Sequence, residues 1–212
     1  KIIEIGISPF LMYVCACVIV IFMNNQLVRY GGDLSVGTYG IASALSIVFM
    51  MFVIGINQGM QPIAGYNYGA QKLDRMMQVL RLAIIVAVMI MTLGWAIAEL
   101  LPRQVARIFT ADSTLIEMSV KAIRIDMLVF PIVGFQMVVT NFFQCIGKVK
   151  ISIFLSLSRQ LIFLLPLLYT LPIFFGIDGV WYSLPCSDTL ASMVTATILV
   201  VYMRKFRKQI KS

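Results

Sequence analysis

The sequence contains no histidine and few charged residues. Its 212 residues include 9 Asp and Glu and 17 Lys and Arg, so charged residues make up only 12% of the chain. Without histidine, catalytic dyads and triads that use an imidazole are excluded, and so are metal sites built on one. The chain also lacks an HExxH string and a recognisable nucleophile with a base, which argues against a membrane-embedded enzyme. We therefore expect no catalytic residue, no metal and no cofactor.

Cysteine is scarce as well, and its spacing carries no ligand motif. The four cysteines all lie in apolar runs without a CxxC pair: Cys15, Cys17, Cys145 and Cys186. Such residues are interpreted as small buried hydrophobes.

The net charge of +8 does not indicate nucleic-acid binding, because the basic residues gather between apolar runs and at the C-terminal tail.

Apolar residues dominate what is present. They make up 60% of the chain, and the mean hydropathy is +0.95. This composition predicts an all-α, polytopic membrane protein with six transmembrane helices. The expected spans are residues 5–27, 38–63, 80–101, 125–146, 151–175 and 180–202. An amphipathic stretch at 103–121 separates the third span from the fourth and carries Asp112 and Ser113, which are typical helix-capping residues.

The basic residues predict the orientation. Counted on alternate sides of the six spans, twelve Lys and Arg fall on one side and five on the other. Because cytoplasmic loops carry the excess of Lys and Arg, both termini of this segment are predicted to be cytoplasmic. We expect a multi-pass protein of the cell (inner) membrane.

Polar side chains form stripes on four of the six spans. On the second span the stripe ends in Asn57 and Gln61, and on the fourth it contains Gln136, Thr140 and Gln144. One interpretation is that these residues hydrogen-bond packed helices together. The alternative is that they line one shared, water-reachable cavity. Residues predicted to line it are Asn57, Gln61, Gln136, Thr140, Asn141, Gln144, Arg159 and Asp188.

Two charges are expected deep in the membrane, Arg159 on the fifth span and Asp188 on the sixth. An ionised group there is costly facing lipid, so both should face a cavity or a partner. An extended Arg159 side chain is long enough to reach Asp188, so a direct ion pair between the two is possible. Such a pair would be either a functional contact or a structural contact that holds two helices together. Asp126 and Glu99 lie near expected span ends and are predicted to be interfacial.

The string GINQGMQPIAGYNYGA at 55–70 is the most specific motif. Gly55, Gly59, Gly65 and Gly69 give small-xxx-small spacings that favour close helix approach, and Pro62 is expected to end regular helix between them. With the strings at 24–27, 31–33, 142–148, 158–160, 176–181 and 185–188, it resembles the signature of the multidrug and toxic compound extrusion (MATE) family over essentially the whole chain.

The resemblance implies a function. Members of that family are antiporters with two six-span lobes, which export amphipathic, often cationic drugs in exchange for H⁺ or Na⁺. This chain looks like the carboxyl-terminal lobe, with the amino-terminal lobe missing. Tyr13 and Phe135 would add aromatic surface to the drug cavity. Alternating access between the two lobes would be the mechanism.

One departure from the family concerns the coupling ion. Sodium-coupled relatives place carboxylates on the first and fourth spans of this lobe. Here no acid lies between Glu4 and Asp33 on the first span, and the only acid of the fourth is Asp126, close to its outer end. Asp188 is therefore the local candidate for ion coupling. Two alternatives stay open: a lipid-linked saccharide flippase of the same superfamily, which would need several deep cationic residues, and a structural membrane subunit without an accessible cleft.

Overall fold

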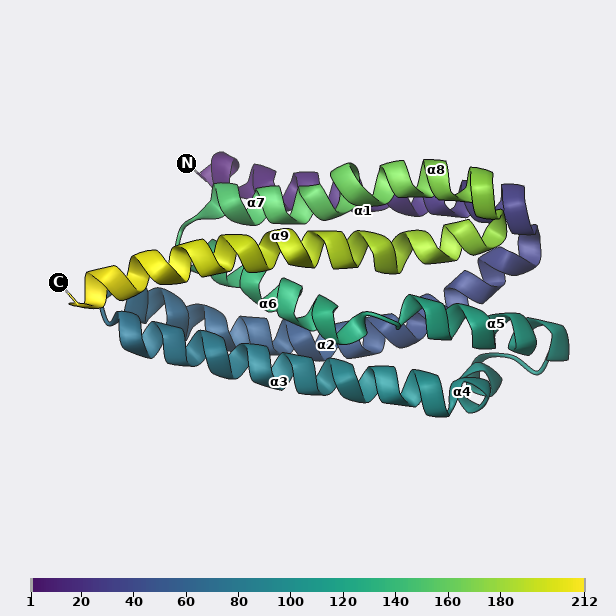
Figure 1. Ribbon diagram of the computed structural model, residues 1–212, viewed down its shortest axis with the longest axis horizontal. Coiled ribbons are helices and arrows are strands. Elements are labelled where there is room, and N and C mark those ends of the chain that lie inside the picture. Colours follow the sequence, from purple (N-terminus) through teal and green to yellow (C-terminus); the bar gives the residue numbers. More distant parts are fainter. Residues whose placement is uncertain (1, 212) are drawn as a thin grey trace.

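The chain folds into an elongated bundle of helices that run along one long axis (Figure 1). The computed structural model describes the backbone of residues 2–211 and the side chains of residues 14–204 and 206. Within these residues the regular structure is entirely helical. In chain order the elements are α1 (Ile2–Gly31), α2 (Asp33–Gly69), α3 (Leu73–Leu100), α4 (Pro102–Phe109), α5 (Ser113–Asp126), α6 (Phe130–Cys145), α7 (Val149–Leu157), the π-helix η1 (Ser158–Leu164), α8 (Leu165–Phe175) and α9 (Ile177–Lys211).

The helices are long and apolar enough to cross a membrane. Five segments meet this condition on their own, and α5 together with α6 forms a sixth that is bent by 51°. The predicted class, an all-α polytopic membrane protein, is confirmed. The helices extend beyond most of the predicted spans, and the stretch expected at 103–121 is divided between α4 and α5. Asp112 caps α5, because its Oδ1 accepts hydrogen bonds from the amides of Thr114 and Leu115.

Proline explains the irregular fifth span. Pro166 has no amide hydrogen, and its ring would clash with the carbonyl four residues earlier in a regular helix. The chain widens into η1 just before this residue, where the amide of Leu165 donates to the carbonyl of Gln160, five residues back. Arg159 is the second residue of η1, so the wider turns of this helix set its position.

Pro62 does not act as predicted. We expected it to end regular helix, but α2 continues through it as far as Gly69. In a membrane helix the lost hydrogen bond is tolerated, because neighbouring groups compensate and the flanking turns remain bonded. A Cβ built on Gly65 would lie 3.4 Å from the carbonyl oxygen of Cys145, so only this glycine of the motif meets a neighbouring backbone. Gly55, Gly59 and Gly69 face open space.

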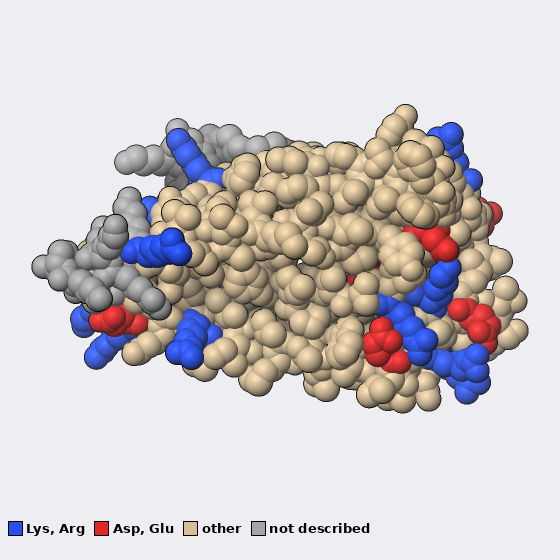
Figure 2. Space-filling model, viewed as in Figure 1, with Lys and Arg blue, Asp and Glu red and all other residues tan. Residues whose placement is uncertain are grey.

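Charged residues divide the surface into two ends. Figure 2 shows mostly Lys and Arg, with some acidic atoms beside them, near the start of α3, and Lys and Arg mixed with several acids at the opposite end. At this mixed end, Arg103 pairs with Glu117, Lys121 pairs with Asp178 at 2.5 Å, and Arg124 lies 3.5 Å from Glu99. We call the first end the basic end, defined by Lys72, Arg75, Arg81, Lys148, Lys150 and Arg204. The apolar belt between the two ends matches a membrane-embedded protein.

Candidate functional site

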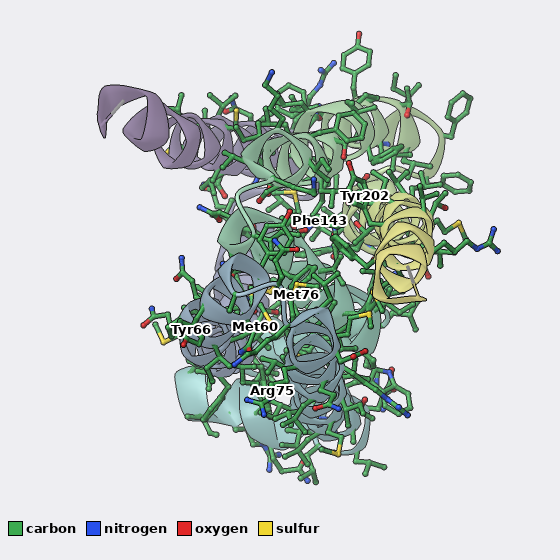
Figure 3. All side chains as sticks on the ribbon, turned by 90° about the vertical axis from the view of Figure 1, so that its left-hand side faces the viewer. Met60, Tyr66, Arg75, Met76, Phe143 and Tyr202 are labelled. Carbon is green, nitrogen blue, oxygen red and sulfur yellow. The ribbon has the colours of Figure 1, made fainter. Side chains whose placement is uncertain are left out.

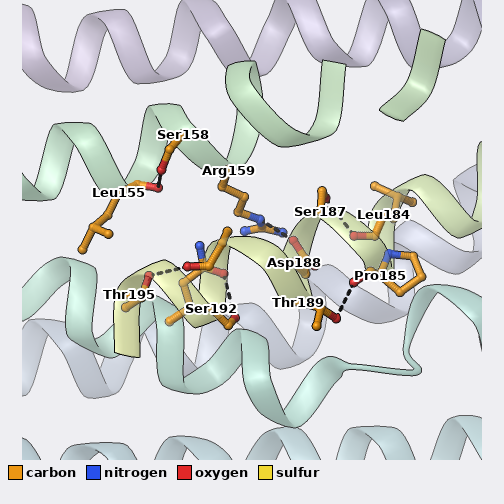
Figure 4. Close-up of polar contacts among 12 residues, drawn as sticks. Leu155, Ser158, Arg159, Leu184, Pro185, Ser187, Asp188, Thr189, Ser192 and Thr195 are labelled. Atoms are coloured by element: carbon orange, nitrogen blue, oxygen red, sulfur yellow. Dashed lines mark hydrogen bonds and ion pairs between the residues drawn. The ribbon is translucent and has the colours of Figure 1, made fainter. Parts of the chain in front are cut away.

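An ion pair between α9 and the first turn of η1 lies at the centre of the lobe. Arg159 Nε donates to Asp188 Oδ1 at 2.6 Å, and a terminal guanidinium nitrogen donates to Oδ2 at 3.2 Å (Figure 4). The Asp188 side chain is 10% exposed and that of Arg159 is 28% exposed. The two parallel bonds match the fork of a guanidinium to both carboxylate oxygens. The direct pair that the sequence allowed is therefore present.

A hollow lined by amides and hydroxyls lies on one side of this pair. We call it the amide hollow. It has a volume of about 370 Å³ and lies between α2, α6, α7 and η1. Its lining includes the predicted residues Asn57, Gln136, Thr140, Asn141, Gln144 and Arg159. The missed residues Ser152, Ser156 and Gln160 line it as well; the two serines belong to the same stripe as Arg159, and Gln160 is its neighbour in the chain.

Of the other four predicted cavity residues, three lie outside the amide hollow and the fourth, Tyr13, is not described. Gln61 is exposed and does not line the amide hollow, because it follows Asn57 by a full turn of α2 and lies beyond the edge of the hollow. Asp188 lines a second hollow instead. The Tyr13 side chain falls outside the described residues. Phe135 is half-buried and packs against the apolar core.

The second hollow lies between α2, the α5–α6 bend, Arg159 and α9. We call it the acidic hollow. Its volume is about 230 Å³ and both Asp126 and Asp188 line it, together with Tyr39, Ser43 and Ser46. Asp126 Oδ2 accepts a hydrogen bond of 2.6 Å from Ser46 Oγ. Two carboxylates and one guanidinium therefore share a single small cavity inside the bundle.

The interfacial prediction for Asp126 is wrong. The sequence pattern placed the start of the fourth span at residue 125, which put Asp126 at the membrane surface. In the structure Asp126 is the last residue of α5, at the bend to α6, and its carboxylate lines the acidic hollow and accepts a hydrogen bond from Ser46. Glu99 lies in the last turn of α3 and faces Arg124 at the mixed end, and its interfacial position stays a prediction.

Arg159 is the only residue common to the linings of the two hollows among the residues described. Its ion pair with Asp188 therefore lies where the two hollows meet, and the amide hollow has no other charged residue in its lining, whereas the acidic hollow has two carboxylates. On the amide side, Gln136 is 4% exposed, and its Oε1 accepts a hydrogen bond from Ser192 Oγ at 3.4 Å. This bond ties α6 to α9 next to the pair.

Two acceptors at the amide hollow have no partner. Within the described part of the chain, Asn57 Oδ1 and Gln160 Oε1 are buried and accept no hydrogen bond. A buried amide oxygen without a donor costs about 1–3 kcal/mol, so the hollow favours a ligand or water that donates.

No group of three or more Asp, Glu, Cys or His side chains that would suit a metal ion is found among the described residues. The arrangement is suited to reversible binding of small molecules.

Comparison with known proteins agrees with this architecture. The MatE family model matches residues 5–170. The multidrug export proteins MepA of Staphylococcus aureus and of Staphylococcus saprophyticus are 25% and 24% identical over 207 residues, which is 98% of this chain and 45% of each relative. The chain thus spans about half the length of the curated relatives it matches.

Solved structures give the same result. The MATE multidrug transporter DinF-BH, solved in complex with R6G, is 38% identical, with a TM-score of 0.81 over 92% of this chain and 44% of DinF-BH. A MATE transporter in a bent conformation is 20% identical and has the same fold, with a TM-score of 0.90 over 98% of this chain and 46% of that one. With a family model that covers most of its length, this chain belongs to the MatE family.

Proposed function

We propose that this chain is the carboxyl-terminal half of a cation-coupled multidrug antiporter that exports amphipathic or cationic compounds by alternating access. The observation that carries the proposal is the Arg159–Asp188 pair, which lies between the amide hollow and the acidic hollow inside a helical bundle. If a drug and an ion bind in two hollows that share Arg159, binding of one can change the affinity for the other, as an exchange requires. The amino-terminal half would complete the central cleft.

The amide hollow is the proposed drug-facing surface. Its only charged residue, Arg159, is already paired with Asp188, so the surface offers hydrogen bonds and few fixed charges. The unpartnered oxygens of Asn57 and Gln160 favour compounds that carry N–H or O–H donors. A surface of this kind selects loosely among varied ligands rather than recognising one metabolite.

The acidic hollow is the proposed coupling site. With all three groups ionised, Asp126, Asp188 and Arg159 carry a net charge of −1, from two acids and one base. Binding of one H⁺ or Na⁺ brings this buried charge to zero, which is favourable at low dielectric. The sequence indicated Asp188 alone, and the position of Asp126 supports adding it as the second acid. Apart from this ion, the proposed mechanism uses no cofactor.

The orientation follows from the two ends. We propose that this segment lies in the cell membrane with its basic end facing the cytoplasm, so that both of its termini are cytoplasmic.

A flippase for lipid-linked saccharides is less well supported, because the amide hollow has one cation, and that cation is paired. Transporters of this family are not enzymes in general, and the proposed cycle contains no covalent step.

Drug efflux by the intact protein in proteoliposomes tests the proposal. With an imposed H⁺ or Na⁺ gradient, Asp126→Asn and Asp188→Asn are expected to lose gradient-driven efflux of a cationic dye while retaining dye binding. Glu117→Gln is the matched control, because it removes an exposed acid at the mixed end and should transport normally. Efflux at the wild-type rate in both hollow variants would refute the assignment of the coupling site.

A further inference from the structure

A third cavity lies on the outside of the bundle, away from both hollows. It is a groove of about 760 Å³ between α3 and α9 near the basic end, and it shares no residue with either hollow. Seen from the basic end, α2 with Tyr66 lies on one side of the lobe and α9 with Tyr202 on the other (Figure 3). The groove therefore opens on the α9 side, away from the face that α1 and α2 present.

The lining of this groove is ordered along the helix axis. Ile84, Ile85 and Leu199 form its apolar part. Arg81 follows toward the basic end, and Asp74 lies at the mouth, near the start of α3. At 1.5 Å per residue, Arg81 is about 12 Å inside the first residue of α3, and Asp74 is about 10 Å nearer to the water.

Arg81 lies at the inner edge of the basic end, eight residues after the first residue of α3. Its side chain is exposed on an apolar span, and no carboxylate among the described residues lies within ion-pair distance of it. A guanidinium facing the membrane is stabilised when it reaches the phosphate level or pairs with an anion. Guanidinium groups bind phosphate oxygens through two parallel hydrogen bonds.

We propose that the groove binds one phospholipid with a primary ammonium headgroup, of the phosphatidylethanolamine type. From the membrane interior outward, such a lipid presents acyl chain, phosphate and ammonium. The groove presents apolar surface, Arg81 and Asp74 in the same order, so each part of the lipid meets its complement. Gln78 lies between the two charges and offers a further donor to the phosphate. This binding is independent of the transport activity proposed above.

The charge order separates this lipid from its relatives. Phosphatidylcholine has a quaternary ammonium that cannot donate a hydrogen bond to Asp74. Phosphatidylglycerol has no ammonium at all. A free phosphate ion would contact Arg81 but would leave the apolar part of the groove unused. We therefore expect preference for the primary amine over the quaternary one, and no competition from inorganic phosphate.

Lipid binding to the purified intact protein, measured by native mass spectrometry, tests the proposal. Phosphatidylethanolamine is expected to bind about fivefold more tightly than phosphatidylcholine, equivalent to about 1 kcal/mol. Asp74→Asn should abolish that preference while leaving phosphatidylcholine binding unchanged. Arg81→Gln should weaken both lipids, and Arg81→Lys should retain most of the binding. Arg75→Gln is the matched control, because it removes an exposed charge of the same helix that does not line the groove.

A second measurement locates the bound lipid. Phosphatidylethanolamine with a photoreactive diazirine in its acyl chain should crosslink to peptides that contain Ile84, Ile85 or Leu199. Equal binding of the two lipids by wild-type protein would overturn the proposal. So would crosslinks that avoid α3 and α9, since another part of the protein would then cover the groove.

Discussion

Removing either partner of the Arg159–Asp188 pair should destabilise the protein, but the two removals should differ in size. Asp188→Asn leaves Arg159 beside Asp126 in the acidic hollow, with a local net charge of zero. Arg159→Gln leaves two carboxylates facing one cavity without a cation, with a local net charge of −2. The second arrangement is the less favourable one inside a membrane bundle.

The size of the effect follows from the burial of the pair. Losing one partner of a fully buried pair costs about 3–5 kcal/mol. Since the Arg159 side chain is 28% exposed, solvent screens part of this cost, and we expect about 2–3 kcal/mol for Asp188→Asn. Repulsion between the remaining carboxylates should add about 1–2 kcal/mol for Arg159→Gln. The double variant Arg159→Gln/Asp188→Asn should be less destabilised than the sum of the two single variants.

Denaturant unfolding of the purified intact protein in detergent measures these differences as a double-mutant cycle. Glu117→Gln serves as the control, because its exposed pair with Arg103 should contribute no more than about 1 kcal/mol. If the two single variants lose equal stability, Asp126 does not interact with Arg159. If the double variant loses the full sum, the observed hydrogen bonds do not couple the two side chains, and the partition between the hollows has no energetic basis.

Two further substitutions test the packing and the acidic hollow. Gly179→Ala should lower the unfolding free energy by about 1–3 kcal/mol, because the new methyl group would meet the backbone of Leu171 in α8. Gly59→Ala, which lies inside α2 and faces open space, should instead raise it by about 0.5–1 kcal/mol in the same assay. Ser46→Ala should lower the unfolding free energy by about 1.5–3 kcal/mol, because it removes the hydroxyl that donates to Asp126. Ser43→Ala is the control and should be close to neutral, because Ser43 bonds only to a backbone carbonyl at an exposed position. Equal losses in the two variants would show that the bond to Asp126 contributes nothing.

Much of the fold could be predicted because membrane insertion imposes a simple rule on sequence. Long apolar runs must be helical where no water is available to the backbone, so composition alone fixes the class. The amide stripe of the fourth span was predictable for a related reason. Gln136, Thr140 and Gln144 recur at helical spacing, and side chains three or four residues apart share one face.

The features that could not be predicted depend on the ends and bends of helices. Hydropathy does not distinguish a helix that begins at residue 125 from one that begins at Ser113 and bends, and this difference moves Asp126 from the surface to the interior. Pro62 illustrates the same problem, since a proline in a membrane helix can end it or leave it continuous. Whether Gln61 reaches the cavity depends on where the neighbouring helices diverge, which only tertiary packing determines.

The Arg159–Asp188 pair between the two hollows joins two segments in which the regular α-helical hydrogen bonding is interrupted. Arg159 lies in η1, whose wider turns replace the usual i to i−4 hydrogen bonds next to Pro166. Its partner Asp188 lies on α9, three residues after Pro185, which also removes one backbone donor. Backbone with fewer regular bonds resists displacement less than an intact helix does. Among the described residues, the pair that joins the two hollows is therefore held by two segments in which a proline interrupts the regular backbone hydrogen bonding.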